Sequence, residues 1–143
     1  MAIPSMPAHL TLQIVSADRA LVNAQVDEVQ IPGAGGYLGI LPGHTPLLTT
    51  MQVGTLWYRQ GSEKYYLAIA FGFAEVLPDR VTILTQIAEK AGEIDLTRAE
   101  AAKKRAEERL AKPAIDMDFE RARIAMLKAL VRLQVASRAR IRS

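Results

Sequence analysis

The stretch from Gly35 to Thr49 reads GGYLGILPGHTPLLT and holds four glycines and two prolines between short apolar runs. Glycine permits positive φ angles and close approach of the backbone, whereas proline fixes φ and removes a hydrogen-bond donor. The stretch therefore predicts a rigid, shaped surface loop between strands. It lacks the Gly-Lys-Ser/Thr ending of a phosphate-binding P-loop, and its glycine spacing does not fit a dinucleotide-binding fingerprint.

Short segments of alternating apolar and polar residues lie on both sides of this stretch. They cover residues 9–15, 26–31, 47–51, 54–59, 64–71, 73–77 and 81–87, and turn residues separate them. Evenly spaced short strands are typical of a β-sandwich or a barrel. Two stacked antiparallel sheets would bury alternate residues. The predicted core is Leu12, Ile14, Val29, Ile31, Leu56, Leu67, Ile69, Val76 and Ile83.

The composition changes at Gly92, because all nine glycines lie at or before it and Ala, Glu, Lys, Arg and Leu dominate after it. These later residues are strong helix formers. We predict an α+β protein with a β-sandwich domain over residues 1–92 and an antiparallel two-helix hairpin over residues 93–143. No apolar run approaches the ~20 residues that a membrane span needs, and the N-terminus lacks the pattern of a secretory signal.

The helix boundaries follow from capping residues. Asp95 is a plausible N-cap for a helix that runs to about Leu110, and Asp116 or Asp118 for a second helix that runs to about Ile141. The first helix carries one Ala-rich apolar stripe, whereas the second carries two. The stripes are Leu96, Ala99, Ala106 and Leu110; Phe119, Ala122, Met126, Leu130 and Leu133; and Ile124, Leu127, Val131 and Val135. A second stripe needs a second partner, so the second helix should dock on the sandwich, bind another protein, or alternate between them.

Charge is distributed unevenly along the chain. Residues 1–92 hold 5 basic and 7 acidic side chains, and residues 93–143 hold 13 and 8. A basic C-terminal segment favours an anionic partner such as nucleic acid, lipid headgroups, a nucleotide or an acidic protein surface, although it also suits a solvated helix face. The chain has no Cys and two His, and no motif combines a nucleophile with a base. We therefore predict no catalytic residues and no metal site.

Three segments carry a resemblance to a known family: LQIVSAD at residues 12–18, the stretch at 35–49, and EIDLTRA at 93–99. The chain resembles the epsilon subunit of bacterial F-type ATP synthase. The resemblance implies a non-catalytic central-stalk subunit, without a required cofactor, that links the gamma subunit to the c-subunit ring and couples proton translocation to ATP synthesis. It also implies a peripheral position at the cytoplasmic face of the inner (plasma) membrane, without insertion into the bilayer.

The segment at 94–99 matches the ATP-binding motif of some bacterial epsilon subunits, which implies ATP as a regulatory ligand. The matching residues are Glu89, Ile94, Asp95, Arg98, Ala99, Arg105, Lys128 and Arg132. Lys128 stands where the family has an arginine, and lysine lacks the planar fork that grips phosphate at two points. Read without the resemblance, Asp95 is a helix cap and Arg98 a surface ion-pair partner. With no P-loop, we expect no hydrolysis of ATP.

The resemblance also places contacts with partner proteins. Pro42 and His44 would contact gamma, and the turn with Gly33, Gly36 and Tyr37 would face the c ring. The alternative is that the loop only shapes the end of the sandwich.

The helices would regulate hydrolysis. Folded down, they lie on the sandwich; extended, the second helix enters the catalytic head of alpha and beta subunits. Its basic residues would then face acidic loops: Arg123, Lys128, Arg132, Arg138, Arg140 and Arg142. The alternative, a basic nucleic-acid-binding module, explains the charged tail, but interleaved aromatic residues are missing.

Overall fold

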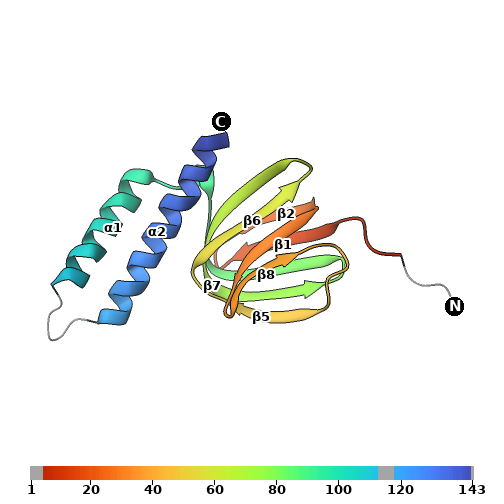
Figure 1. Cartoon of the computed structure of the whole chain (residues 1–143), viewed down its shortest axis with the longest axis horizontal. Helices are drawn as coiled ribbons and strands as arrows, with labels where there is room; N and C mark the ends of the chain where they lie inside the picture. Colours follow the sequence, from red (N-terminus) through yellow and green to blue (C-terminus); the bar gives the residue numbers. More distant parts are fainter. Residues whose placement is uncertain (1–4, 113–117, 143) are drawn as a thin grey trace.

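The computed structural model describes residues 5–112 and 118–142, with residues 139–142 as backbone only. Two layers of sheet form the sandwich, and two helices lie side by side at one end of it (Figure 1). The strands are β1 (Leu10–Ser16), β2 (Ala20–Val26), β3 (Glu28–Gly33), β4 (Gly36–Ile40), β5 (Leu47–Met51), β6 (Gly54–Gln60), β7 (Glu63–Leu77) and β8 (Arg80–Lys90). A short 3-10 turn, η1 (Ala91–Glu93), leads to α1 (Leu96–Ala111) and α2 (Phe119–Arg142).

The strands pair in the order β2-β1-β8-β7-β5-β3-β4, and β6 pairs with β3 and β7. The sandwich and the helical hairpin are confirmed, but the sheet is not wholly antiparallel, because β1 and β8 run parallel. A parallel pair needs a long crossover connection, and here the strands β2 to β7 provide it. Period-two patterning identifies strands but not the direction of their neighbours, so the sequence could not reveal this pair.

The glycine- and proline-rich stretch at residues 35–49 is only partly a loop. Gly36–Ile40 forms strand β4, which pairs with β3, and Ile40 is fully buried. The loop itself is limited to residues 41–46. Strand β2 was also missed, since its inward and outward residues do not alternate regularly. The predicted interruption between residues 71 and 73 is instead a bend inside the continuous strand β7.

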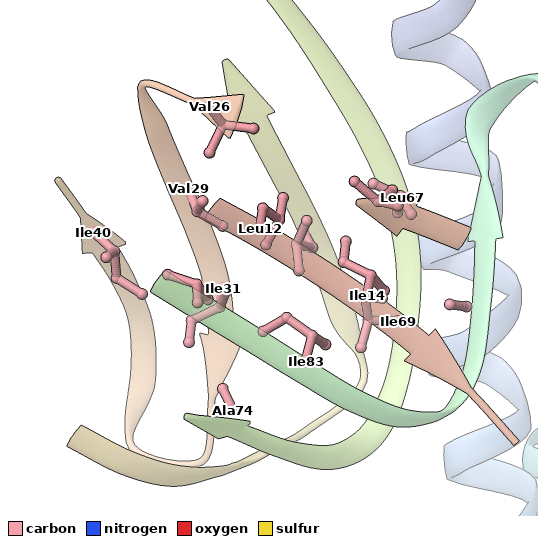
Figure 2. Close-up of a cluster of buried hydrophobic side chains, with 14 of the residues drawn as sticks. Leu12, Ile14, Val26, Val29, Ile31, Ile40, Leu67, Ile69, Ala74 and Ile83 are labelled. Carbon is pink, nitrogen blue, oxygen red and sulfur yellow. The ribbon is translucent and has the colours of Figure 1, made fainter. Parts of the chain in front are cut away.

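Side chains from both layers interdigitate in one core (Figure 2). All nine residues of the predicted core are buried, and Leu10, Val26 and Ile40 join them. Strand pairing aligns these residues: Leu12 lies opposite Val81, and Ile14 opposite Ile83. The core is therefore rigid enough to hold the sandwich surfaces in fixed positions.

Strands β7 and β8 turn a corner together as they pass from one layer to the other. Ile69 and Ala74 both face the core although their sequence positions differ by an odd number, so the inward face reverses between them. Phe71 and Gly72 sit at the corner with φ angles of 63° and 119°. The Thr85 hydroxyl lies 3.2, 2.6 and 3.0 Å from the carbonyl oxygens of Ala70, Phe71 and Ile87. It donates its one proton to these oxygens. The reversal turns the outward face of both strands toward α2.

We expect Gly72→Ala to lower the free energy of unfolding by about 2 kcal/mol more than Gly61→Ala does, in urea titrations of both variants. Both glycines have positive φ, so both substitutions carry backbone strain. A Cβ at Gly72 would also lie 2.1 Å from the Leu84 carbonyl oxygen, whereas one at Gly61 meets nothing within 4 Å. Equal losses would show that the corner adjusts freely.

Each helix starts at an aspartate cap. The Asp95 carboxylate accepts a hydrogen bond from the Arg98 N–H at 3.1 Å, which confirms the predicted N-cap of α1. The Asp118 carboxylate accepts one from the Arg121 N–H at 3.0 Å, so Asp118 caps α2. The other candidate cap, Asp116, lies outside the described residues.

Helix α2 lies between α1 and the sandwich, against β6 and β7 (Figure 1). The contact surfaces of the helices are rich in alanine: the buried residues are Ala99, Ala106, Ala122, Ala129, Val135 and Ala136. Phe119, Leu127 and Leu130, from the two predicted stripes, remain exposed. Of the three alternatives for this helix, docking on the sandwich is the one observed here, and it leaves apolar surface uncovered. Within the described residues, neither helix is both long and apolar enough to cross a membrane.

Candidate functional site

A cavity of about 650 Å³ opens where the β1–β2 turn, the end of β8, η1, α1 and α2 meet. Seven of the eight residues predicted to bind a nucleotide line it: Glu89, Ile94, Asp95, Arg98, Ala99, Arg105 and Arg132. Lys128 is not among the lining residues, and its ammonium lies over the Phe71 ring, 5.8 Å from the ring centre. Residues from both domains therefore meet in one cavity.

The cavity wall is held together across the domain junction by an ion pair. Arg132 of α2 donates from Nε to a Glu89 carboxylate oxygen of β8 at 2.5 Å, and both side chains are partly buried. Because Arg132 belongs to the second helix, this contact exists only while α2 lies on the sandwich. In this conformation α2 therefore contributes Arg132 to the cavity wall.

Two arginines of the cavity have no charged or hydrogen-bonding partner in the part of the chain that the structure describes. Arg98 and Arg105 are separated by two turns of α1 and so face the same side. Both side chains are exposed, and within residues 5–112 and 118–142 neither guanidinium has a hydrogen-bond or ion-pair partner. Paired guanidinium groups in a concave surface favour a multiply charged anion, phosphate above all.

The β1–β2 turn also lines the cavity, a position that no sequence pattern predicted. Ser16, Ala17, Asp18 and Arg19 form this wall. Arg19 donates from both terminal nitrogens to the two Glu93 carboxylate oxygens, at 3.1 and 2.5 Å. The hydrogen bond from Arg19 lowers the pKa of Glu93 and raises that of Arg19. A hydrogen bond from the Ser16 hydroxyl lowers the pKa of Asp18. No local signal in the sequence connects this turn with α1.

The residues predicted to contact gamma and the c ring lie at opposite ends of β4. Gly33 and Gly36 close the β3–β4 turn, and the Tyr37 hydroxyl accepts a hydrogen bond from the Thr55 N–H at 3.1 Å. At the other end, Pro42 and His44 belong to the loop 41–46. His44 donates from Nδ1 to the Thr45 carbonyl at 2.6 Å, so its ring orientation is fixed.

An exposed apolar row crosses the outer face of the sandwich. Val15, Leu84 and Phe73 lie side by side on β1, β8 and β7. Phe73 pairs with Thr50 of β5. Leu48 comes two residues before Thr50 and so lies on the same face of the sheet. Leu84, Phe73 and Leu48 are 52, 55 and 72% exposed. We call these four residues the apolar row; contiguous exposed apolar groups of this kind mark interaction surfaces.

The basic residues of α2 that were predicted to make inhibitory contacts differ in their surroundings. Lys128, Arg132 and Arg138 turn toward the sandwich, where Arg138 lies over the Tyr66 ring at 5.8 Å. Arg123 is exposed and pairs with Glu120 on its own helix. The side chains of Arg140 and Arg142 lie outside the described residues. Half of the predicted inhibitory contacts are thus engaged by the sandwich in this conformation.

The described residues hold no cluster of three His, Cys, Asp or Glu side chains that could bind a metal ion. What they do hold is a cavity lined by both arginines and carboxylates, an apolar row and an incompletely covered helix. These features define a binding protein in which a helical hairpin docks on a β-sandwich.

Comparison with known proteins identifies the family. The family model of the ATP synthase Delta/Epsilon chain beta-sandwich domain matches residues 9–91, and that of its long alpha-helix domain matches residues 93–137. The chain belongs to the Delta/Epsilon chain family of ATP synthase. It is accordingly a non-catalytic subunit, as the sequence predicted.

Individual relatives cover almost the whole chain. It is 47% identical over 135 residues to ATP synthase epsilon chain 2 of Syntrophotalea carbinolica, covering 93% of this chain and 97% of that one. It is 49% identical over 132 residues to the ATP synthase epsilon chain of Lawsonia intracellularis, covering 92% and 99%. A chain in the Euglena gracilis mitochondrial ATP synthase matches with a TM-score of 0.81 and 25% identity, covering 96% of this chain and 86% of that one. None of these relatives supports the nucleic-acid-binding alternative.

Proposed function

We propose that this chain is the rotor subunit that attaches the gamma subunit to the c ring, at the cytoplasmic face of the inner (plasma) membrane. In this proposal, residues 1–92 bind gamma and the c ring, and residues 93–143 regulate ATP hydrolysis. The matched Euglena gracilis chain belongs to an assembly that contains the c-ring. The family and this neighbour support a place in the central stalk.

The apolar row is the observation that carries attachment. Its four side chains would lose water contact against gamma, a gain of ~25 cal/mol for each Å² of apolar area buried. The row lies on the outer face of the β1–β8–β7–β5 layer, and β5 follows directly after the loop with Pro42 and His44. The apolar row and the loop would form one continuous gamma-binding surface. The β3–β4 turn with Gly33, Gly36 and Tyr37 would contact the c ring.

Regulation rests on the uncovered side of α2. Phe119, Leu127 and Leu130 are exposed and fall within about a quarter of a turn of one another on the helix, with Arg123 between them. We call these four residues the exposed strip. An apolar surface that carries a cation fits an apolar and acidic partner, which the alpha and beta subunits would supply when α2 extends. Such a helix has a distinct set of contacts in each state, as a switch requires.

ATP would act as a regulatory ligand in the cavity, held by Arg98 and Arg105. Since Arg132 reaches this cavity only when α2 is docked, bound nucleotide would stabilise the docked state. ATP binding would thus oppose extension of α2 and the inhibition that extension causes.

We expect millimolar ATP to raise the melting temperature of the isolated chain by several degrees, because a ligand that binds only the folded state stabilises it. Arg98→Ala should abolish the shift. The cap of α1 uses the Arg98 backbone N–H, which the substitution keeps, so α1 stays intact. Lys104→Ala, on α1 but outside the cavity lining, serves as the matched control and should keep the shift. A wild-type chain whose melting temperature ignores ATP would contradict the proposal.

A further inference from the structure

We propose that Arg19 of the β1–β2 turn is a positioning residue of the nucleotide pocket, which holds Glu93 and so fixes the orientation of Asp95 and Arg98. This inference rests on the proposed function, because it concerns ATP binding in the same cavity. Arg19 and Glu93 are separated by 74 residues and both line the cavity.

The contact between the two residues is bidentate. Two nitrogens of one planar guanidinium meet two oxygens of one carboxylate. Such a pair fixes both the distance and the relative orientation of the groups, which a single hydrogen bond does not. It therefore acts as a clamp between the β1–β2 turn and η1.

Glu93 transmits this constraint to the start of α1. Its carboxylate also accepts from the Lys90 N–H at 3.4 Å, and the Ile94 N–H donates to the Ala91 carbonyl at 3.4 Å, which closes η1. Only Ile94 lies between Glu93 and the cap residue Asp95. A rotation of the backbone at Glu93 would consequently move the cap, and with it the side chain of Arg98.

The turn that carries Arg19 is itself well fixed. The Ser16 N–H donates to the Arg19 carbonyl at 2.8 Å, and the Ser16 hydroxyl donates to Asp18 at 2.7 Å. Ser16 is buried at the end of β1. A functional side chain is held most precisely when its support is rigid, and the sandwich core provides that support here.

The four arginines that line the cavity therefore have separate roles. Glu93 neutralises Arg19 and Glu89 neutralises Arg132, and both pairs join elements across the cavity. In the described part of the chain, Arg98 and Arg105 are left to meet the anion. Arg19 acts on the ligand through Glu93 and the cap, without touching the phosphates.

The test uses the full chain and isothermal titration with ATP. Arg19→Ala should weaken ATP binding about tenfold, and Arg19→Lys should weaken it less, because lysine keeps the charge but loses the second contact. Arg19→Glu and Glu93→Arg should each weaken binding, and the double variant should recover most of the wild-type affinity. Arg80→Ala removes an exposed arginine of the sandwich outside the cavity and is the matched control.

A second measurement separates positioning from simple stabilisation. An exposed ion pair adds little to global stability, so the melting temperature of Arg19→Ala should stay within about two degrees of wild type. Amide hydrogen exchange without nucleotide should nevertheless rise at Ile94, Arg98 and Ala99, whose N–H groups close η1 and cap α1. Exchange elsewhere in α1 and α2 should not change.

Unchanged ATP affinity in Arg19→Ala, or a loss that the charge-reversed double variant does not recover, would overturn the inference. If the wild-type chain binds no ATP, the proposed function fails and the nucleotide role of Arg19 fails with it. In that case hydrogen exchange at the Ile94, Arg98 and Ala99 amides still tests whether the Arg19–Glu93 pair orders η1 and the start of α1. Unchanged exchange would overturn that as well.

Discussion

Deletion of residues 117–143 is expected to raise ATP hydrolysis by the assembled enzyme about tenfold, because the extended state of α2 can no longer form. A tenfold effect corresponds to a coupling free energy of ~1.4 kcal/mol, within the ordinary range. The sandwich should remain attached to gamma, since the apolar row and the loop 41–46 are untouched. ATPase assays of the assembled enzyme, with ATP-driven proton pumping measured in parallel, would test both statements.

A point variant separates the contacts of the extended state from those of the docked state. Arg132 and Arg138 hold α2 on the sandwich, so replacing them would disturb both states. Leu127 and Leu130 are exposed in the docked state, and Leu127→Asp with Leu130→Asp should relieve inhibition without releasing α2. Thr97→Asp, an added acid at an exposed position of α1, is the matched control. If neither the deletion nor the double variant changes hydrolysis, α2 is structural and the regulatory proposal is wrong.

The sequence predicted those parts of the fold that depend on local pattern. Alternation placed Leu12, Ile14 and Ile83 in the core, and the Asp95 cap marked the start of α1. Strand β4 was missed because its glycines resemble loop residues, although pairing with β3 makes them strand. The parallel β1–β8 pair and the corner at Gly72 depend on contacts between distant segments, which periodicity does not record.

In the candidate site too, local sequence predicted some residues, and contacts between distant segments placed the others. The positions around Asp95 and Arg98 came from a resemblance in sequence, and the structure brings them together with Glu89 and Arg132. Arg19 could not be predicted, because its meaning depends on a partner 74 residues away. The apolar row was hidden for a related reason: alternation turns Leu84 and Phe73 outward, but only the pairing of β1, β8, β7 and β5 brings them together with Val15 and Leu48.

Substitutions in the apolar row are expected to have a large effect on gamma binding. Leu84 and Phe73 are neighbours on β8 and β7 and are both about half exposed. If gamma covers them, Leu84→Asp with Phe73→Asp places two carboxylates in a desolvated apolar contact, and burying an unpaired charge is strongly unfavourable. Central residues of interfaces each contribute ~2 kcal/mol or more. We therefore expect the double variant to bind purified gamma at least about 100-fold more weakly.

The control for this experiment is Ser62→Asp, which adds a carboxylate at an exposed position in the β6–β7 turn, outside the row. It should bind gamma like wild type. Because the side chains of Leu84 and Phe73 point outward from a buried core, the double variant should keep its strand circular dichroism and nearly its full melting temperature. Loss of binding with an intact fold then locates the interface. Binding within a few-fold of wild type would place gamma on another face, and the row would need a different partner.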